Sequence, residues 1–328
     1  MIKAGFILYT ERKRHRRQAH ISTNAIQSSH IYSTYFAPRG RSRIYTLGMQ
    51  IAQLYLSPFD QIIGFIGEAG SGKSVLIKGM FPGIELTNDD DGVNVRPLPL
   101  LEQEYETGFF TPHTYHLDIR FETGFHQLSE LADAVRLAVR RGKRIIIEHF
   151  DLIYPLLGVN ANLLIGVGEQ IVITRPNLFG PLPQELCDIV YPSLAYRLMA
   201  HSAEDLCEYA MTQEQMLACS HGDIRHGFVL EFNEHQPDID IPTLEARVNE
   251  LIRQDLPIDY YDESHILLGG VQHYCTGPRT HVRSTGRIIG FRLLDHFIYD
   301  HFHKTYMLVG CVGDDSEENI RKLETIHG

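Results

Sequence analysis

Gly67-Glu68-Ala69-Gly70-Ser71-Gly72-Lys73-Ser74 decides how the first half of this 328-residue chain folds. The stretch fits the pattern G-x-x-x-x-G-K-[ST] at every defined position. It follows the apolar run Gln61–Gly67, which is typical of a buried strand, and precedes Ser74–Phe81, which can form a helix. A glycine-rich turn between strand and helix presents backbone N–H groups at a helix N-terminus, so the stretch predicts a phosphate-binding loop.

Each residue type that the pattern specifies has a chemical role. The glycines allow the backbone to close around phosphates, the Lys73 ammonium neutralises the outer phosphates, and the Ser74 hydroxyl coordinates magnesium. We therefore expect ATP and Mg²⁺ as the ligands. The predicted cofactor-binding residues of the loop are Gly67, Gly70, Ser71, Gly72, Lys73 and Ser74.

A nucleotide site also needs a carboxylate for the metal or for the attacking group. The apolar run Arg144–Glu148 ends in a carboxylate, and Asp151 follows shortly after it. Asn88–Asp91 is a second acidic segment, which follows the expected strand Ile84–Thr87. We predict catalytic roles for Lys73, Glu148 and Asp89 and a cofactor-binding role for Asp151. A solvated turn at Asp89–Asp91 and a helix cap at Asp151 are the alternatives.

The remaining periodicity of this half alternates between helix and strand. Gln127–Arg141 has one apolar helical face, and the apolar runs Arg144–Glu148 and Gln170–Thr174 are typical of buried strands. Strands and helices in this order predict an α/β domain with a parallel sheet and helices on both of its faces.

The stretch from Gln61 to Thr174 resembles P-loop NTPases, and among them the small-molecule kinases of the uridine kinase and phosphoribulokinase group. This resemblance rests mainly on the phosphate loop. It implies an ATP-dependent phosphotransferase, or an ATPase, that acts on a small-molecule acceptor whose identity the sequence does not reveal.

The second half carries a different signature. Arg279–Phe291 resembles the closing signature of the second additional domain of alanyl- and threonyl-tRNA synthetases, which ends in Cys-Gly-Gly-Thr-His-Val and then Thr-Gly-Glu-Ile-Gly. Leu244–Ile252 followed by Leu256–Ile258 is similar to the helix and strand before that signature, and His201–Leu206 is similar to the family's His-x-x-x-His segment. The resemblance implies an α+β module like the synthetase editing domain.

In that family two histidines one helical turn apart, a cysteine and a final histidine surround a zinc ion beside the ester of mischarged tRNA. The matching positions are His201, Asp205, Cys275 and His281. Asp205 replaces a histidine, and five residues rather than three separate Cys275 from His281. Residues four apart share a helical face, so His201 and Asp205 can hold one ion. We expect these four residues to converge and to bind Zn²⁺.

Composition limits the class of protein. The net charge of −11 excludes a chain that coats nucleic acid nonspecifically, so any contact with tRNA or aminoacyl-tRNA is expected to be local. Five scattered cysteines fit a reducing compartment, and no apolar run is long enough for a membrane span. A cytoplasmic protein without membrane contact is expected. The predicted divisions are a weakly ordered extension over residues 1–43, the P-loop domain over 44–192 and the synthetase-like domain over 193–328.

Three functions follow from these expectations. The first is an ATP-dependent phosphotransferase or ATPase. The second is a metal-dependent hydrolase that clears mischarged aminoacyl-tRNA. The third is a nucleotide-gated RNA-binding protein without catalysis.

Overall fold

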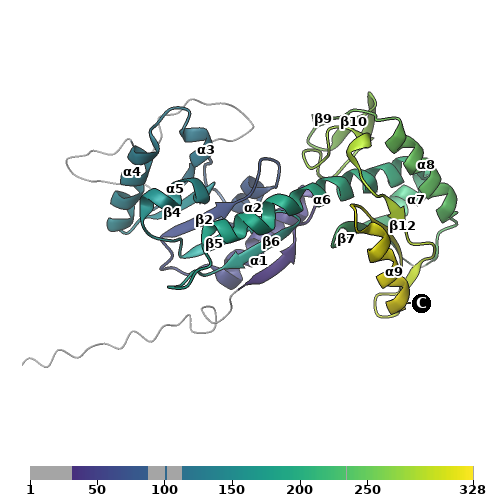
Figure 1. Cartoon of the computed structure of the whole chain (residues 1–328), viewed down its shortest axis with the longest axis horizontal. Coiled ribbons are helices and arrows are strands. Elements are labelled where there is room, and N and C mark those ends of the chain that lie inside the picture. Colours follow the sequence, from purple (N-terminus) through teal and green to yellow (C-terminus); the bar gives the residue numbers. More distant parts are fainter. Residues whose placement is uncertain (1–31, 88–99, 102–112, 234, 328) are drawn as a thin grey trace, which may run out of the picture.

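The computed structural model describes residues 32–87, 100–101, 113–233 and 235–327. Two lobes, one at each end of a long helix, make up this part of the chain (Figure 1). No helix among the described residues is both long enough and apolar enough to cross a membrane.

A six-stranded mixed sheet forms the centre of the first lobe, in the order β1-β6-β5-β2-β4-β3. The four consecutive strands β5, β2, β4 and β3 run parallel to one another. Strand β6 is antiparallel to β5, and β1 is antiparallel to β6. The prediction of a parallel sheet is therefore confirmed for these four strands and wrong for β6 and β1. The strands are β1 Ser33–Phe36, β2 Ile62–Ile66, β3 Thr114–Asp118, β4 Arg144–Glu148, β5 Leu163–Val167 and β6 Gln170–Thr174.

Helices cover both faces of this sheet because successive side chains of its strands point to opposite faces and both sets are apolar. In β2, Ile62 and Ile66 pack with the helices on one face, and Ile63 and Phe65 pack with those on the other. The first face carries α3 Ile119–Glu122, α4 Leu128–Arg140, α5 Phe150–Leu157 and the start of α6; the second carries α1 Arg41–Tyr55 and α2 Lys73–Met80.

Helix α6, Pro183–Ala210, connects the two lobes. Pro183 occupies its first turn, where the missing N–H costs nothing. Leu186 and Val190 pack on the sheet of the first lobe, while Ala203 and Leu206 belong to the core of the second. The same rigid helix therefore takes part in both cores.

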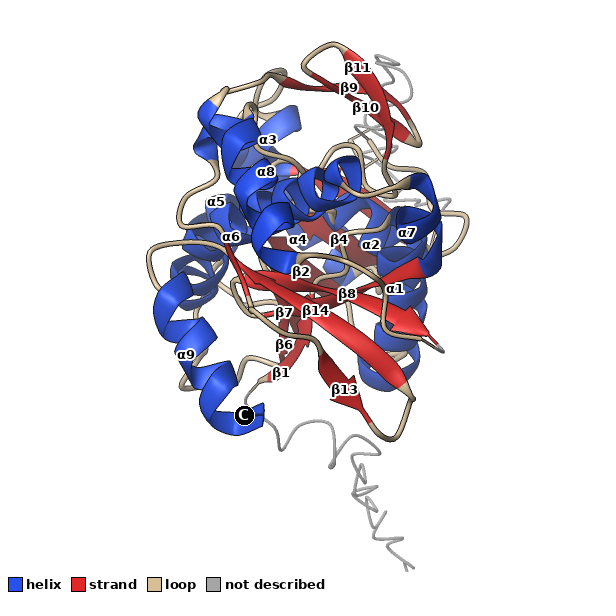
Figure 2. Cartoon of the chain, turned by 90° about the vertical axis from the view of Figure 1, so that its right-hand side faces the viewer, coloured by secondary structure: helices blue, strands red, loops and turns tan. Residues whose placement is uncertain are grey.

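The second lobe is built from two antiparallel sheets and three helices besides α6 (Figure 2). One sheet has the order β12-β14-β8-β7, with β13 paired to β14, and the other has the order β11-β10-β9. Its strands are β7 Cys219–Ile224, β8 Gly227–Asn233, β9 Ile258–Asp262, β10 His265–Leu268, β11 Val271–Tyr274, β12 Arg292–Leu293, β13 Ile298–Asp300 and β14 Thr305–Cys311. Its helices are α7 Gln213–Ala218, α8 Ile241–Arg253 and α9 Ser316–His327, and a short 3₁₀ turn, Thr285–Arg287, follows β11.

Three predictions about the organisation are wrong. Residues 33–43 are not an extension, because Ser33–Phe36 pairs with β6 and Arg41 begins α1. The boundary at 192/193 falls inside α6, since the prolines at 183 and 192 are accommodated within one helix. Ile84–Thr87 forms no strand among the described residues; the place beside β4 is taken by β3, and Thr87 instead donates its N–H to His116 Nδ1 at 3.1 Å. The first 31 residues lie outside the described part.

Candidate functional site

Three parallel strands end level with one another beside the predicted phosphate loop. In the sheet register, Phe65 of β2 is paired with Glu148 of β4, and Glu148 with Asp118 of β3. The loop leaves β2 directly after Ile66 and enters α2 at Lys73. The carboxyl ends of adjacent parallel strands are the usual ligand site of open α/β sheets.

The backbone of the loop adopts conformations that require glycine. Gly70 and Gly72 have φ of 79° and 87°, and Gly72 is the N-cap of α2. A Cβ on Gly67 would lie 2.5 Å from the carbonyl oxygen of Val167. The Lys73 ammonium lies across the loop and donates to the carbonyls of Gly67 at 2.9 Å and Glu68 at 2.8 Å. The loop is therefore closed around its own lysine.

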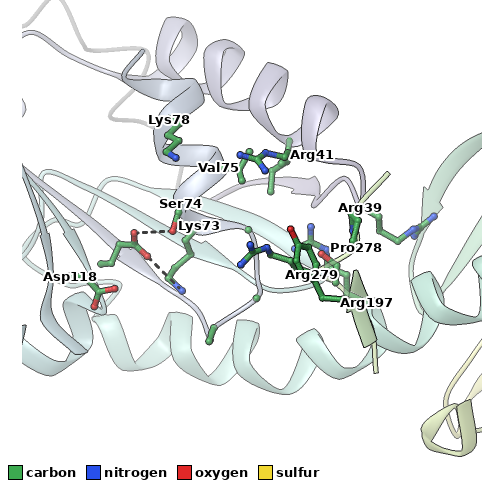
Figure 3. Close-up of a pocket in the computed structure, with 18 of the residues that line it drawn as sticks. Arg39, Arg41, Lys73, Ser74, Val75, Lys78, Asp118, Arg197, Pro278 and Arg279 are labelled. Atoms are coloured by element: carbon green, nitrogen blue, oxygen red, sulfur yellow. Dashed lines mark hydrogen bonds and ion pairs between the residues drawn. The ribbon is translucent and has the colours of Figure 1, made fainter. Parts of the chain in front are cut away.

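Glu148 is held by three partners. Ser74 Oγ donates to its Oε1 at 3.3 Å, and Lys73 Nζ lies 3.8 Å from its Oε2; Figure 3 draws both interactions as dashed lines from Ser74 and Lys73. His116 Nε2 lies 3.1 Å from its Oε1. Because His116 Nδ1 accepts the N–H of Thr87, the ring proton of a neutral His116 sits on Nε2 and is donated to Glu148. Burial opposes ionisation, but His116 and then Lys73 lower the pKa of Glu148, so it is a carboxylate at neutral pH.

The groups around Glu148 have shifted pKa values of their own. Burial lowers the pKa of Lys73, and burial together with Glu148 raises the pKa of Asp118. The backbone of His149 has a φ of 56°, which residues other than glycine rarely adopt. Its Nδ1 is buried with no hydrogen-bond partner in the described part of the chain. Burial, Lys73 and Arg120 lower the pKa of His149 to about 4.

A cavity of about 470 Å³ opens at the loop and extends to the second lobe. Gly70, Gly72, Lys73, Ser74 and Glu148 line it from the first lobe. Its opposite wall comes from the second lobe, where the Arg279 guanidinium lies 4.5 Å from the Tyr260 ring centroid. Seven arginines and lysines and three carboxylates line the cavity: Arg39, Arg41, Lys73, Lys78, Arg120, Arg197 and Arg279, against Asp118, Glu148 and Glu263. A positive cavity of this size suits a polyanion such as a nucleoside triphosphate.

Two buried arginines link the first lobe to α6 and the second lobe (Figure 3). Arg197 of α6 donates to the carbonyls of Ser71 at 2.5 Å and Pro38 at 2.7 Å. Arg39 makes a two-pronged ion pair with Glu204 of α6, at 3.0 and 2.9 Å. Neither residue was predicted from the sequence, because Arg39 lies in a segment without periodicity and Arg197 lies next to the expected domain boundary.

One of the predicted residues of this site lies elsewhere, and another is not among the described residues. Asp151 does not line the cavity; it is in the first turn of α5 and accepts a hydrogen bond from Tyr191 at 3.3 Å. The alternative of a helix cap is wrong as well, because His149 is the N-cap of α5 and no side chain caps this helix among the described residues. Asp89 lies outside the described residues. Asp118 and His116 were missed, although the run Thr114–Asp118 ends in a carboxylate in the same way as Arg144–Glu148.

The four predicted metal ligands converge in the second lobe. One donor atom from each of His201, Asp205, Cys275 and His281 lies within 4.8 Å of the others. His281 Nε2 is 2.9 Å from Asp205 Oδ2, and Cys275 Sγ is 3.5 Å from His201 Nε2 and 3.7 Å from His281 Nε2. The wider gap between Cys275 and His281 is closed by the turn 276–280.

Backbone carbonyls orient both imidazoles. His201 Nδ1 lies 2.8 Å from the carbonyl oxygen of Thr280, and His281 Nδ1 lies 3.2 Å from that of Pro278. A carbonyl only accepts, so each Nδ1 carries the proton and each Nε2 directs its lone pair into the cluster in the neutral ring. A metal-binding histidine is normally held by its other nitrogen in this way.

The cluster is buried, and burial sets its acid–base properties. His201, Asp205 and Cys275 are at most 4% exposed. Burial lowers the pKa of His201 to about 3 and raises the pKa of the Cys275 thiol. Although burial opposes it, the neighbouring His201 and His281 lower the pKa of Asp205. Two imidazoles, a carboxylate and a sulfur form a donor set that fits Zn²⁺.

Comparison with known proteins adds no family to this description. No protein-family model matches the chain, and no curated protein sequence matches it significantly.

Proposed function

We propose that this protein binds ATP with Mg²⁺ in the cavity between the lobes and transfers or hydrolyses its terminal phosphate. The observation that carries the proposal is the level alignment of the glycine loop, Lys73, Ser74 and the carboxylate of Glu148 at one end of the cavity. The loop N–H groups and Lys73 would hold the phosphates, and Ser74 with Glu148 would hold the magnesium ion.

Support for a transfer reaction comes from the far wall of the cavity. Arg120 and Arg279 line it together with Tyr260, so there is room and positive charge beyond the phosphates for a second substrate. We also propose that the first lobe is a P-loop NTPase domain similar to the uridine kinase and phosphoribulokinase group. The acceptor is an unidentified small molecule.

Product analysis tests the proposal directly. Purified protein is incubated with γ-labelled ATP, magnesium and a panel of metabolites and tRNA, and the label is followed into phosphate or a new ester. Label in a metabolite identifies a phosphotransferase, and label in free phosphate alone identifies an ATPase. Unchanged ATP in every mixture, with ATP bound, would overturn the catalytic part and leave a nucleotide-gated binding protein.

The second candidate function is the metal-dependent hydrolysis of mischarged aminoacyl-tRNA by a module similar to the synthetase second additional domain. The convergence of His201, Asp205, Cys275 and His281 favours it. Four buried protein ligands, however, complete a tetrahedral zinc sphere, which is the arrangement of structural ions rather than catalytic ones. The geometry therefore supports best a structural zinc ion in a module that binds tRNA.

Metal analysis separates the two parts of this candidate. We expect zinc in the purified protein and its loss in Cys275→Ser, with a lower thermal midpoint after chelation. Deacylation of mischarged tRNA by the zinc-loaded protein would establish the hydrolase. Zinc without deacylation would leave a structural site.

A further inference from the structure

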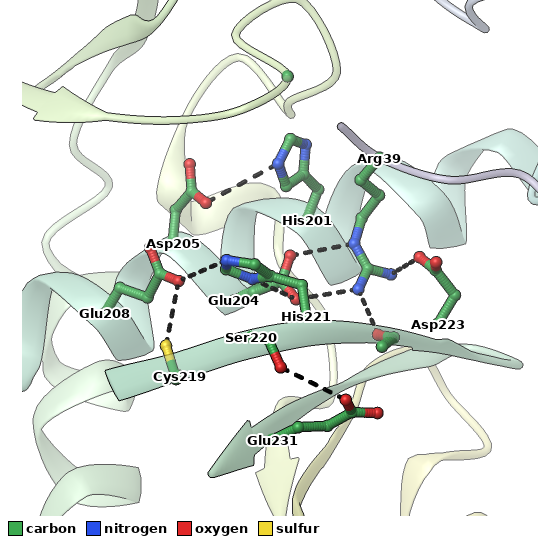
Figure 4. Close-up of polar contacts among 12 residues, drawn as sticks. Arg39, His201, Glu204, Asp205, Glu208, Cys219, Ser220, His221, Asp223 and Glu231 are labelled. Atoms are coloured by element: carbon green, nitrogen blue, oxygen red, sulfur yellow. Dashed lines mark hydrogen bonds and ion pairs between the residues drawn. The ribbon is translucent and has the colours of Figure 1, made fainter. Parts of the chain in front are cut away.

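A second group of metal-binding side chains lies against the four-residue cluster. Asp205, Glu208 and His273 each offer one donor atom, and these atoms lie within 4.8 Å of one another. Asp205 and Glu208 are close to one turn apart on α6, and His273 reaches them from β11. Asp205 thus belongs to both groups. Figure 4 shows Asp205 with His201 and Glu208, the other members of these groups on α6.

His273 is the side chain that points to a ligand. It is 8% exposed, and its Nε2 is buried without a hydrogen-bond partner among the described residues. Glu208 Oε2 lies 3.9 Å from this nitrogen, which is too far for a hydrogen bond and suitable for two ligands of one ion. An unsatisfied buried imidazole nitrogen is destabilising, and a cation between the two groups would satisfy it.

The charge balance of α6 also calls for a cation at this place. Glu204, Asp205 and Glu208 are all buried, at 2%, 4% and 7% exposure. Glu204 is neutralised by Arg39, whereas the partners of Glu208 are His221 at 3.3 Å and the Cys219 thiol at 3.7 Å (Figure 4). Glu208 therefore lacks the permanent cation that Glu204 has.

We propose that Asp205, Glu208 and His273 bind a second divalent metal ion, which shares the Asp205 carboxylate with the ion held by the four-residue cluster. Nitrogen and oxygen donors in this combination suit Zn²⁺ and similar transition metals. Carboxylate-bridged pairs of ions lie about 3.5–4 Å apart in known two-metal sites.

The two ions would differ in coordination. The four-residue cluster supplies a full tetrahedral set, while the second site has three protein ligands and leaves a position for water or a substrate oxygen. An open position of this kind is what hydrolytic metal sites have. This inference rests on metal binding by the four-residue cluster, and it places any hydrolytic chemistry of the second lobe at the second ion.

Metal stoichiometry tests the proposal. The full chain is stripped of metal, reloaded with Zn²⁺ and freed of excess, and bound zinc is measured by elemental analysis. We expect about two ions per chain in the wild type, about one in His273→Gln and in Glu208→Gln, and about two in the control His265→Ala. His265 lies on the neighbouring strand β10 and its ring pairs with Asp262 instead of the cluster.

Cobalt substitution keeps the two sites distinguishable if a variant folds poorly. Cys275 is the thiol of the first group, so we expect the first equivalent of Co²⁺ to give a thiolate charge-transfer band and the second to add visible bands without it. One ion per chain in the wild type that persists in His273→Gln would overturn the second site and keep the first. No bound metal at all would overturn both, and an unchanged count of two in both variants would overturn the ligand assignment.

Discussion

The cavity and the two metal-ligand clusters lie on either side of the turn 276–280 and differ in charge. Cationic side chains predominate around the cavity, and carboxylates predominate in the clusters. The cavity is lined by more cations than carboxylates, and its Lys73 is paired with backbone carbonyls in addition to Glu148. The second lobe buries three carboxylates of α6 close together. One region is suited to an anion and the other to cations.

The turn 276–280 belongs to both regions. Pro278 and Thr280 line the cavity, and their carbonyl oxygens receive the imidazole N–H groups of His281 and His201. The N–H of Arg41, the first residue of α1, donates to the carbonyl oxygen of Thr276 at 3.0 Å. Because the same few residues shape both regions, a change in one is expected to reach the other through this turn.

The largest expected effect is a loss of ATP binding in the cavity without a change at the metal-ligand clusters. Lys73→Ala removes a buried cation from the phosphate site, and the loss of a buried charged partner costs about 2–5 kcal/mol, or about 30- to 4,000-fold in affinity. We expect ATP binding to fall below detection in calorimetry while zinc content stays unchanged. Lys73 is only 5% exposed, so Lys73→Met, which retains the aliphatic stem, controls for packing. Wild-type ATP affinity in both variants would overturn the assignment.

The next effect separates binding from turnover on the same side. Glu148→Gln preserves shape and removes the charge that would serve magnesium or a proton, so we expect ATP to bind and turnover to fall by about 100-fold or more. The His116 hydrogen bond is retained by the amide oxygen. Steady-state kinetics with calorimetry checks the split, and unchanged turnover would make Glu148 structural.

The two regions also differ in how far the sequence determines them. The predicted phosphate loop is eight contiguous residues whose backbone is the proposed ligand-binding group, so a local pattern is sufficient to predict it. Its neighbour Asp118 comes from a separate strand, and no local pattern states that β3 lies beside β4. Arg39 and Arg279 reach the cavity only through the packing of the second lobe on the first.

The metal-ligand cluster could not be found from local pattern alone. Only His201 and Asp205 share a helix, and Cys275 and His281 approach them through tertiary packing across 70 or more positions. The resemblance to the synthetase domain supplied the four positions, but it supplied neither Glu208 nor His273. Apolar runs predicted the strands β2, β4 and β6, but they did not reveal β1, β3 or β5. The reversed direction of β6 depends on the short turn between β5 and β6.

A smaller effect is expected from the shared turn. A Cβ on Gly277 would lie 2.2 Å from the carbonyl oxygen of Arg39 and 2.9 Å from His201 Cε1. Overpacking of this kind costs about 1–3 kcal/mol, so we expect Gly277→Ala to weaken both ATP and zinc binding by about tenfold. The control Gly40→Ala meets only the rotatable Thr276 hydroxyl at 3.2 Å. A loss at one site with no change at the other would break the link between the regions.

The smallest effect concerns the pH dependence of stability on the anion side. The pKa of His149 is about 4 in the folded protein and about 6.5 for an ordinary histidine. Lowering the pH from about 6.5 towards 4 therefore protonates this residue in the unfolded chain first, and stability is lost over that range and fully present above it. Lys73 and Arg120 lower the pKa, while Glu148 and Glu68 oppose them.

His149→Asn isolates this contribution, because asparagine tolerates the left-handed backbone at φ of 56° and does not titrate. We expect urea unfolding at a series of pH values to show a shallower loss of unfolding free energy between pH 6.5 and 4 in the variant. Parallel curves for the two proteins would show that His149 titrates alike in both states. Because bound triphosphate would offset the charge of Lys73 and Arg120, ATP should raise the pKa of His149 in the folded protein and so make the wild-type loss below pH 6.5 smaller. Zinc, which binds outside the cavity, should leave this His149-dependent difference unchanged.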